Sequence, residues 1–291
     1  MDITILNRRV VRVLVASCVV FACCLGVYSY CRYRDYHRLD DTLNYLMSGC
    51  PDPRPSADYL RKHVTELPQH LKVMGLYSAE SDKRGVNAVM SAERPETCVA
   101  RFFLFWEDWT NVLFFVERGL ETSRDSQSVL MFATACAELR DAGRLSTLSQ
   151  EDRSRLGWRY DPLWHMANGH YSNAVASLTL TLPPVSGAWP CKSDAESQAM
   201  SAGYRLKVEA ISKGGMCEAR KAEIEAIFVM YTTTAITSNI QDIAKVVSND
   251  AYDVYDPIQI CRYAYEGYRN SGEDREARVW RERGLMICNA R

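Results

Sequence analysis

A long uncharged stretch near the N-terminus constrains this chain more than any other feature. From Val13 to Tyr30 the sequence reads VLVASCVVFACCLGVYSY, eighteen residues without a charge, directly after a basic cluster that ends at Arg12. At about 1.5 Å per residue, a helix over this stretch would be roughly 27 Å long, close to the hydrocarbon thickness of a bilayer. The sequence therefore predicts a transmembrane helix over residues 13–30 that contacts membrane lipid.

The flanking charges favour a cytoplasmic N-terminus. Three arginines precede the stretch and three follow it, so the count of basic residues alone does not decide the orientation. Moving a short tail with three arginines across the membrane is unfavourable. We therefore expect a short cytoplasmic tail over 1–12 and the remaining chain outside, in the periplasm of a bacterium.

Cleavage of the stretch is the alternative to a lasting anchor. Val15-Ala16-Ser17-Cys18 resembles a bacterial lipoprotein box, which would make the chain a lipoprotein. The apolar core before that box is short, and an equally apolar run from Val19 would stay on the mature protein. An uncleaved, single-pass anchor in the bacterial inner membrane is the prediction, with a lipoprotein as the alternative.

Composition after the anchor is that of a globular protein. The chain is 47% hydrophobic and 24% charged, with a formal net charge of -1. Such a balance provides no strong field that would attract a polyanion, so nucleic acid is not expected as a partner.

The eleven cysteines leave two interpretations open. An oxidising compartment would favour one or more disulfides, whereas cysteines on apolar helix faces, such as Cys136 and Cys261, are equally typical of buried small hydrophobic residues. No CxxC pair occurs, so neither a zinc ribbon nor a thioredoxin-type redox pair is predicted. Seven of the cysteines follow the anchor region: Cys50, Cys98, Cys136, Cys191, Cys217, Cys261 and Cys288.

Apolar residues beyond the anchor recur at helical spacing almost throughout, and alternating runs typical of strands are nearly absent. The clearest stripe predicts one long helix over 96–121, with Glu107 and Asp108 in its middle arguing against a second membrane span. We expect an all-α fold, an N-terminal transmembrane helix followed by a stack of antiparallel α-hairpins, either a solenoid or an irregular helical bundle. Further helices are predicted from Ser56 to Pro68 and near 69–78, 125–141, 162–180, 194–212, 216–230, 235–247, 257–270 and 274–288.

Proline-rich segments mark the predicted boundaries. The sequence Cys50-Pro51-Asp52-Pro53-Arg54-Pro55 ends a juxtamembrane linker over 31–55. A second Pro-rich stretch over 183–192 separates a helical lobe over 56–182 from one over 193–291, or is one long loop between stacked hairpins.

The last part of the chain resembles one tetratricopeptide or Sel1-like repeat. In such a unit a bulky residue precedes the turn glycine by four positions, and a small residue follows it by five. Tyr268, Gly272 and Ala277 fit this pattern, and Gly169 with Ala174 fits the turn and second helix of another unit. A weaker third unit would place its turn at Gly143.

The resemblance covers about a third of the chain, and the glycines do not recur at the regular period of about 34 residues. A generic stack of α-hairpins therefore stays open beside true repeats. The resemblance implies a curved scaffold that binds peptides or partner proteins on its concave face, without chemistry of its own.

The motifs that would indicate an enzyme are missing. The five histidines form no HExxH arrangement, His165 and His170 are not spaced as metal ligands, and P-loop, dinucleotide-binding and GxSxG motifs do not occur. We expect no cofactor, no metal and no catalytic residue. The alternative is a membrane-tethered hydrolase, for example a cell-wall lytic enzyme with one buried glutamic acid of raised pKa.

Aromatic and basic residues cluster late in the chain. Such amphipathic side chains are typical of partner-binding surfaces and also of half-buried packing in a terminal hairpin. The predicted function is a membrane-anchored scaffold for protein-protein interaction or assembly of an envelope complex, with its candidate partner-binding residues at Arg262, Tyr263, Tyr265, Tyr268 and Arg269.

Overall fold

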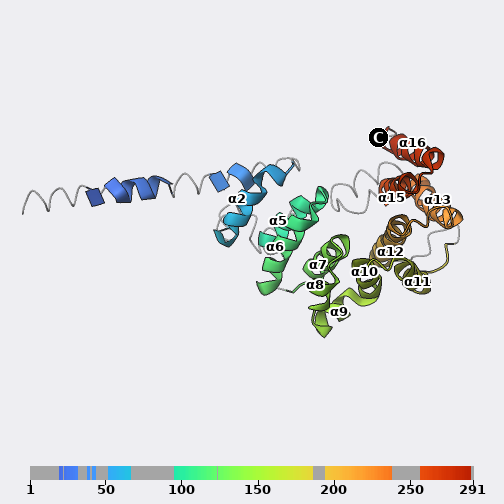
Figure 1. Ribbon diagram of the computed structural model, residues 1–291, viewed down its shortest axis with the longest axis horizontal. Coiled ribbons are helices and arrows are strands. Elements are labelled where there is room, and N and C mark those ends of the chain that lie inside the picture. Colours follow the sequence, from blue (N-terminus) through green and yellow to red (C-terminus); the bar gives the residue numbers. More distant parts are fainter. Residues whose placement is uncertain are drawn as a thin grey trace, which may run out of the picture.

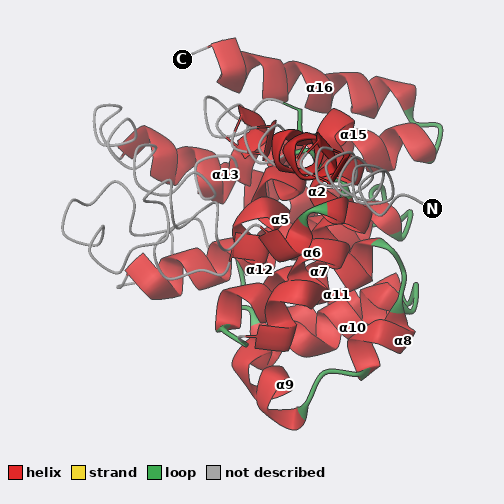
Figure 2. Ribbon diagram, turned by 90° about the vertical axis from the view of Figure 1, so that its left-hand side faces the viewer, coloured by secondary structure: helices red, strands yellow, loops and turns green. Residues whose placement is uncertain are grey.

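The described part of the chain is built from helices alone. The structure is a computed structural model, and Figure 2 shows no strand among the residues that it describes. The all-α prediction is confirmed for these residues, which are 20–21, 23–31, 38–39, 41–43, 52–66, 95–122, 124–185, 194–237 and 256–289.

Short helical elements precede the first long hairpin. The 3-10 turn η1 (Arg54–Ser56) leads into α2 (Ala57–Lys62), and η2 (Val64–Glu66) follows it. The helix predicted from Ser56 to Pro68 is therefore present only in its first part, and a 3-10 turn follows it. The guanidinium of Arg61 lies 5.2 Å from the ring centre of Phe114, which connects α2 to the hairpin described next.

The long helix predicted over 96–121 is wrong, because the chain reverses in its middle. Helix α5 (Pro95–Phe105) ends there, and α6 (Trp109–Thr122) returns along it. Asp108 begins α6, accepting hydrogen bonds from the backbone N–H of Asn111 at 3.2 Å and from its side-chain amide at 2.7 Å. The apolar stripe continues because both helices bury it between them, and the rings of Phe103 and Phe115 stack with centroids 5.5 Å apart.

The next segment contains α7 and two short helices that the sequence pattern did not predict. Asp125 caps α7 (Ser126–Glu138) through the backbone N–H groups of Gln127 and Ser128, each at 2.9 Å. Asp141 caps α8 (Ala142–Ser146), and Ser149 with Asp152 forms a capping box at α9 (Gln150–Leu156). With fewer than three turns each, α8 and α9 are too short to show a helical period.

The remaining helices form three further hairpins. After the 3-10 turn η4 (Gly157–Arg159), they pair in chain order: α10 (Tyr160–Ala167) with α11 (Tyr171–Thr181), α12 (Asp194–Lys213) with α13 (Lys221–Thr237), and α15 (Asp256–Asn270) with α16 (Asp274–Asn289). The predicted helix over 162–180 is thus interrupted at the Gly169 turn that the repeat-like pattern indicated. The predicted helix over 69–78, and most of the one over 235–247, lie outside the described residues.

Within the described ranges, five helices end with the same turn. In each, a residue of positive φ is followed by a backbone N–H that bonds to a carbonyl five residues earlier, as in a Schellman motif. These bonds join Asp108 to Phe103 at 3.1 Å, Asp141 to Cys136 at 2.8 Å, His170 to His165 at 2.8 Å, Met216 to Ile211 at 3.0 Å, and Glu273 to Tyr268 at 2.8 Å.

The turn residues confirm part of the repeat-like pattern. Gly169 and Gly272 have φ of 72° and 80°, and Ala174 and Ala277, five residues later, are buried. The unit placed at Gly143 is displaced, because Arg140, with φ of 54°, forms that turn. A fold of paired, packed helices compatible with a helical repeat is therefore established.

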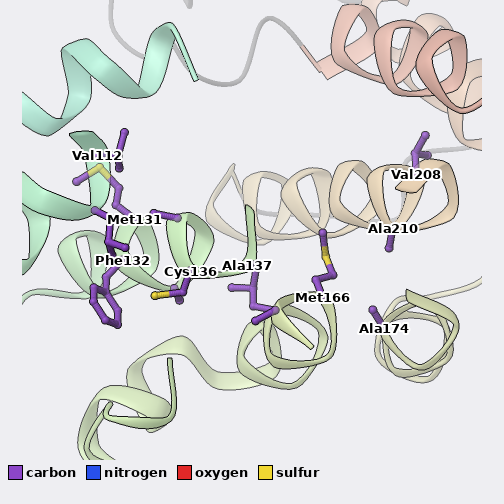
Figure 3. Close-up of a cluster of buried hydrophobic side chains, with 14 of the residues drawn as sticks. Val112, Met131, Phe132, Cys136, Ala137, Met166, Ala174, Val208 and Ala210 are labelled. Atoms are coloured by element: carbon purple, nitrogen blue, oxygen red, sulfur yellow. The ribbon is translucent and has the colours of Figure 1, made fainter. Parts of the chain in front are cut away.

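The hairpins follow a curved path from α5 through α7, α10 and α12 to α15 (Figure 1). Consecutive hairpins pack on each other, with α6 on α7, α11 on α12 and α13 on α15. Figure 3 shows the buried side chains of α7, including Phe132 and Cys136, between Val112 of α6 and Met166 of α10.

Direct packing also joins the two sides of the Pro-rich loop, of which residues 183–185 are described. The hydroxyl of Tyr204 on α12 donates to the carbonyl of Pro183 at 2.6 Å. A Cβ at Gly203 would lie 2.6 Å from Leu182, so α12 approaches the end of α11 closely. The loop therefore connects neighbouring helices of the stack, and the division into two lobes stays a prediction.

Candidate functional site

The candidate partner-binding residues lie on three different sides of α15. Tyr265 is half-buried and Arg269 is exposed, and the Arg269 guanidinium donates to the Tyr265 hydroxyl at 3.3 Å. Arg262 pairs with Glu107 of the α5–α6 turn, and Tyr263 is half-buried. Tyr268 points into the core.

Tyr268 is a packing residue, which corrects its assignment to a binding surface. Its side chain is 0% exposed, and its hydroxyl donates to the carbonyl of Cys217 at 3.1 Å. Burial raises the pKa of Tyr268 above its usual range. The repeat-like pattern had already placed this residue four positions before the turn, where a bulky side chain packs on its neighbours, and that interpretation is the correct one.

Arg262 joins the last hairpin to the first. Its guanidinium forms a two-point ion pair with the carboxylate of Glu107, in the turn between α5 and α6. A second carboxylate, that of Glu266 one turn along α15, accepts from Arg262 Nε at 2.9 Å. These hydrogen bonds, chiefly those with Glu107, raise the pKa of the guanidinium still further, so Arg262 is a permanent cation.

A buried charged triad connects α7 with α12. Lys213 Nζ donates to both carboxylate oxygens of Glu138 and to Oε1 of Glu209, each at 2.6 Å. Glu209 is 6% exposed. Burial, and then the neighbouring Glu209, raise the pKa of Glu138, because two carboxylates share one ammonium group in a site with little water.

Tyr263 lies beside this triad. Burial raises its pKa well above the usual range, and the charge of Glu209 adds to the increase. Glu138 and Glu107 act on Tyr263 in the same direction, and Arg205 acts against them. The two ion-pair groups therefore belong to one polar cluster, to which the α5–α6 turn, α7, α12 and α15 all contribute.

The cluster has the chemistry of a structural or binding surface. A general acid needs a carboxyl group that reaches substrate, whereas both oxygens of Glu138 are held by Lys213. Among the described residues, no group of three or more His, Cys, Asp or Glu side chains is arranged to hold a metal ion. The ring centres of His165 and His170 lie 6.4 Å apart.

A separate hollow lies at the start of α11. It is open to solvent and has a volume of about 340 Å³, with a lining that includes His170, Tyr171, Asn173 and Gly214. His170 precedes α11 without capping it through its side chain. This hollow is on the turn side of the hairpins and shares no residue with the charged cluster.

The described cysteines of the helical stack are buried. Cys136 and Cys217 are free thiols, and burial raises their pKa to about 12 and about 11. Neither is therefore a reactive thiolate at neutral pH. Cys98 and Cys261 are buried as well. The interpretation as small buried hydrophobic residues fits these four positions, and a disulfide elsewhere stays a prediction.

The apolar N-terminal stretch is only partly described. Residues 20–21 and 23–31 are helical and stand apart from the stack (Figure 1). Their large apolar side chains are exposed, from 49% at Leu25 to 67% at Phe21. No helix within the described ranges is both long and apolar enough to cross a membrane. The rest of the predicted span lies outside those ranges.

Sequence reasoning missed the partners of Arg262 and Lys213. The spacing of Glu209 and Lys213 is visible as an i, i+4 pair on a helix. Glu138 and Glu107 are remote in sequence from the residues that they contact, and no local pattern indicates either contact.

Comparisons with known proteins identify no relative. No family model matches the chain, and neither the curated proteins nor the solved structures contain a match.

Proposed function

We propose that this protein is a membrane-anchored scaffold whose helical hairpins bind a partner protein and assemble an envelope complex. The repeated hairpin carries the proposal: five helices share one C-terminal turn, and the hairpins stack along a curved path. Stacked hairpins of this kind, including tetratricopeptide and Sel1-like repeats, present an extended concave surface that is suited to peptides and partner proteins.

The N-terminal helix supports the anchor. Six of its large apolar side chains are exposed to solvent, an arrangement that is costly in water and favourable in lipid. In this proposal residues 13–30 cross the bacterial inner membrane and the helical stack lies in the periplasm. Extraction of membranes with alkaline carbonate tests the anchor: the full chain should stay in the pellet, and release into the supernatant would contradict it.

The exposed side of α15 is the proposed contact surface. Tyr265 and Arg269 combine an aromatic ring with a cation and leave part of both groups accessible. A photo-crosslinking amino acid at position 265 of the full chain should yield one defined adduct in cells. The matched control is position 180 on α11, where Leu180 is 90% exposed and belongs to no cluster. Equal labelling from both positions would contradict a specific surface on α15.

The hydrolase alternative has one observation in its favour, the raised pKa of the buried Glu138. Its ion pair with Lys213 supports a structural role more strongly. Release of soluble fragments from purified cell wall by the wild-type chain, and loss of that release in Glu138→Gln, would favour the enzyme over the scaffold.

A further inference from the structure

Glu107 occupies a backbone position where other hairpins of this chain use glycine. Its φ is 54°, in the left-handed region that side chains with a Cβ rarely adopt. The equivalent turns at 169, 215 and 272 contain glycine, which enters that region without steric cost. A glutamate at this position indicates that its side chain makes an interaction that glycine could not make.

The interaction that the Glu107 side chain makes is an ion pair with Arg262. Two guanidinium nitrogens of Arg262 meet the two carboxylate oxygens of Glu107, a planar geometry specific to arginine and carboxylate. Glu266 holds the same guanidinium from the other side through Nε. The position of Arg262 is thus set by its own helix, and its free edge is directed toward Glu107.

This contact spans the curve of the stack. Glu107 belongs to the α5–α6 hairpin and Arg262 to α15 of the last hairpin, with α7, α10 and α12 between them along the curved path (Figure 1). A direct contact between the two arms of a curve lies on its inner side. The inner side is the concave surface that stacked hairpins generally present to partner proteins.

We propose that Glu107 and Arg262 form a clasp that holds the two arms of the stack together and opens to admit the partner. The inference rests on the proposed function for the identity of the ligand, but the opening itself is independent of any partner. The clasp is suited to opening because both side chains are partly exposed, 33% for Glu107 and 38% for Arg262. An ion pair at that exposure is weak and is screened by salt.

The triad behind the clasp is suited to stay closed. Lys213, Glu138 and Glu209 are more buried than the clasp residues, and they join α7 to α12 in the middle of the stack. The charges of both groups, Glu107 on one side and Glu138 and Glu209 on the other, act on the pKa of Tyr263, which is next to Arg262 in the chain. Opening of the clasp therefore separates α15 from the α5–α6 turn and leaves the α7–α12 connection intact.

A distance measurement on the full chain in detergent tests the clasp. Spin-labelled unnatural amino acids at 118 on α6 and 278 on α16, both exposed positions, report the separation of the two arms without using the native cysteines. The wild-type chain should show a single short distance. Glu107→Gln, which keeps the backbone turn and removes the charge, should give a longer and broader distribution, as should Arg262→Gln.

Two controls separate the ion pair from other effects. The exchanged pair Glu107→Arg with Arg262→Glu should restore the short distance, and Arg140→Gln, at the equivalent turn position of α7, should leave it unchanged. Raising the salt concentration to about 1 M should shift the wild-type chain toward the Glu107→Gln distribution. Identical distributions in wild type and both single variants would overturn the clasp.

Failure of the clasp and failure of the proposed scaffold function give different experimental results. Loss of a specific crosslink at position 265 would remove the scaffold role and leave the distance result standing. Unchanged distances alongside a specific crosslink would remove the clasp and leave the scaffold.

Discussion

The turns at the beginning and at the end of the helical stack share one backbone conformation, a residue with positive φ. They differ in the type of residue that adopts it. The α5–α6 and α7–α8 turns place charged residues, Glu107 and Arg140, at a positive φ of 54°. The three later hairpins place Gly169, Gly215 and Gly272 there. In the later turns the residue serves only the backbone, whereas Glu107 binds Arg262 and Arg140 lies over the ring of Tyr171 at 5.6 Å. A turn position that carries a side chain despite the steric cost therefore marks a contact between distant parts of the chain.

The largest expected effect is that of Lys213→Ala, which tests whether the early and late hairpins depend on one buried connection. Removing the ammonium group leaves the buried carboxylate of Glu209 without its cation, beside a Glu138 that is protonated at pH 8. Loss of one partner from a buried ion pair costs about 3–5 kcal/mol. Chemical denaturation at pH 8 should show a loss of that size, and Lys221→Ala, whose ammonium group pairs with Glu276 at a more exposed site, is the matched control. A change below about 1 kcal/mol would contradict a connecting role for the triad.

The pH dependence of stability is a second test of the buried triad. Glu138 has a pKa raised from 4.5 to about 9 in the folded chain, so the folded state holds a proton that the unfolded chain releases. Its contribution to stability is complete below about pH 4.5 and is lost as the pH rises toward 9. Glu138→Gln should remove this decline, raising Tm at pH 8.5 by about 2–4 °C relative to wild type for each kcal/mol recovered. A parallel decline of Tm in both proteins between pH 5 and 8.5 would show that another group is responsible.

Gly272→Ala tests the glycine side of the comparison. A Cβ at Gly272 would meet no atom within 4 Å, so the expected cost comes from the backbone conformation alone. With φ of 80°, alanine should lower the free energy of unfolding by about 1–2 kcal/mol, as measured by denaturant titration. Asn270→Ala, two positions earlier with an exposed side chain, is the control. Equal effects of the two substitutions would mean that the turn tolerates a side chain.

The smallest effects are expected where glycine replaces the charged turn residues. Arg140→Gly relieves left-handed strain of about 1–2 kcal/mol but loses the contact of the guanidinium with the Tyr171 ring, worth about 0.5–1 kcal/mol, so a small net stabilisation is expected. Glu107→Gly gains the same relief and loses an ion pair worth about 0–1 kcal/mol at its exposure, so its net change should be of similar size. Thermal melts of the two variants measure both changes. A gain from Glu107→Gly equal to the full relief of about 1–2 kcal/mol would show that the clasp adds nothing to stability.

Local features of the fold were predictable because local physics produces them. Helical spacing of apolar residues predicted the all-α class, and Gly169 and Gly272 predicted two of the turns. The reversal at Glu107 was missed because the apolar stripe runs through it without interruption. The Asp108 cap was the available signal, and it was interpreted only as evidence against a membrane span. The turn predicted at Gly143 failed for a related reason, since a charged residue, Arg140, adopts the conformation usually left to glycine.

The candidate site was predictable only in part. Arg262 and Tyr263 were singled out for their residue type, and both belong to the charged cluster. Tyr268 was placed with them and is instead fully buried, because residues five and six positions apart on a helix point to different sides. Exposure of one side chain depends on which neighbouring helix covers it, and that information is not local.

The amino-acid sequence by itself determined the helical class, the glycine turns and the apolar N-terminal stretch, since each depends on residues within a few positions of one another. Tertiary structure alone decided that Glu107 meets Arg262 and that Lys213 meets Glu138. These contacts depend on the curvature of the whole stack, which is the sum of the packing angles of every helix between them. A small change in any one angle would separate the partners, so no short segment of the chain contains the information that brings them together.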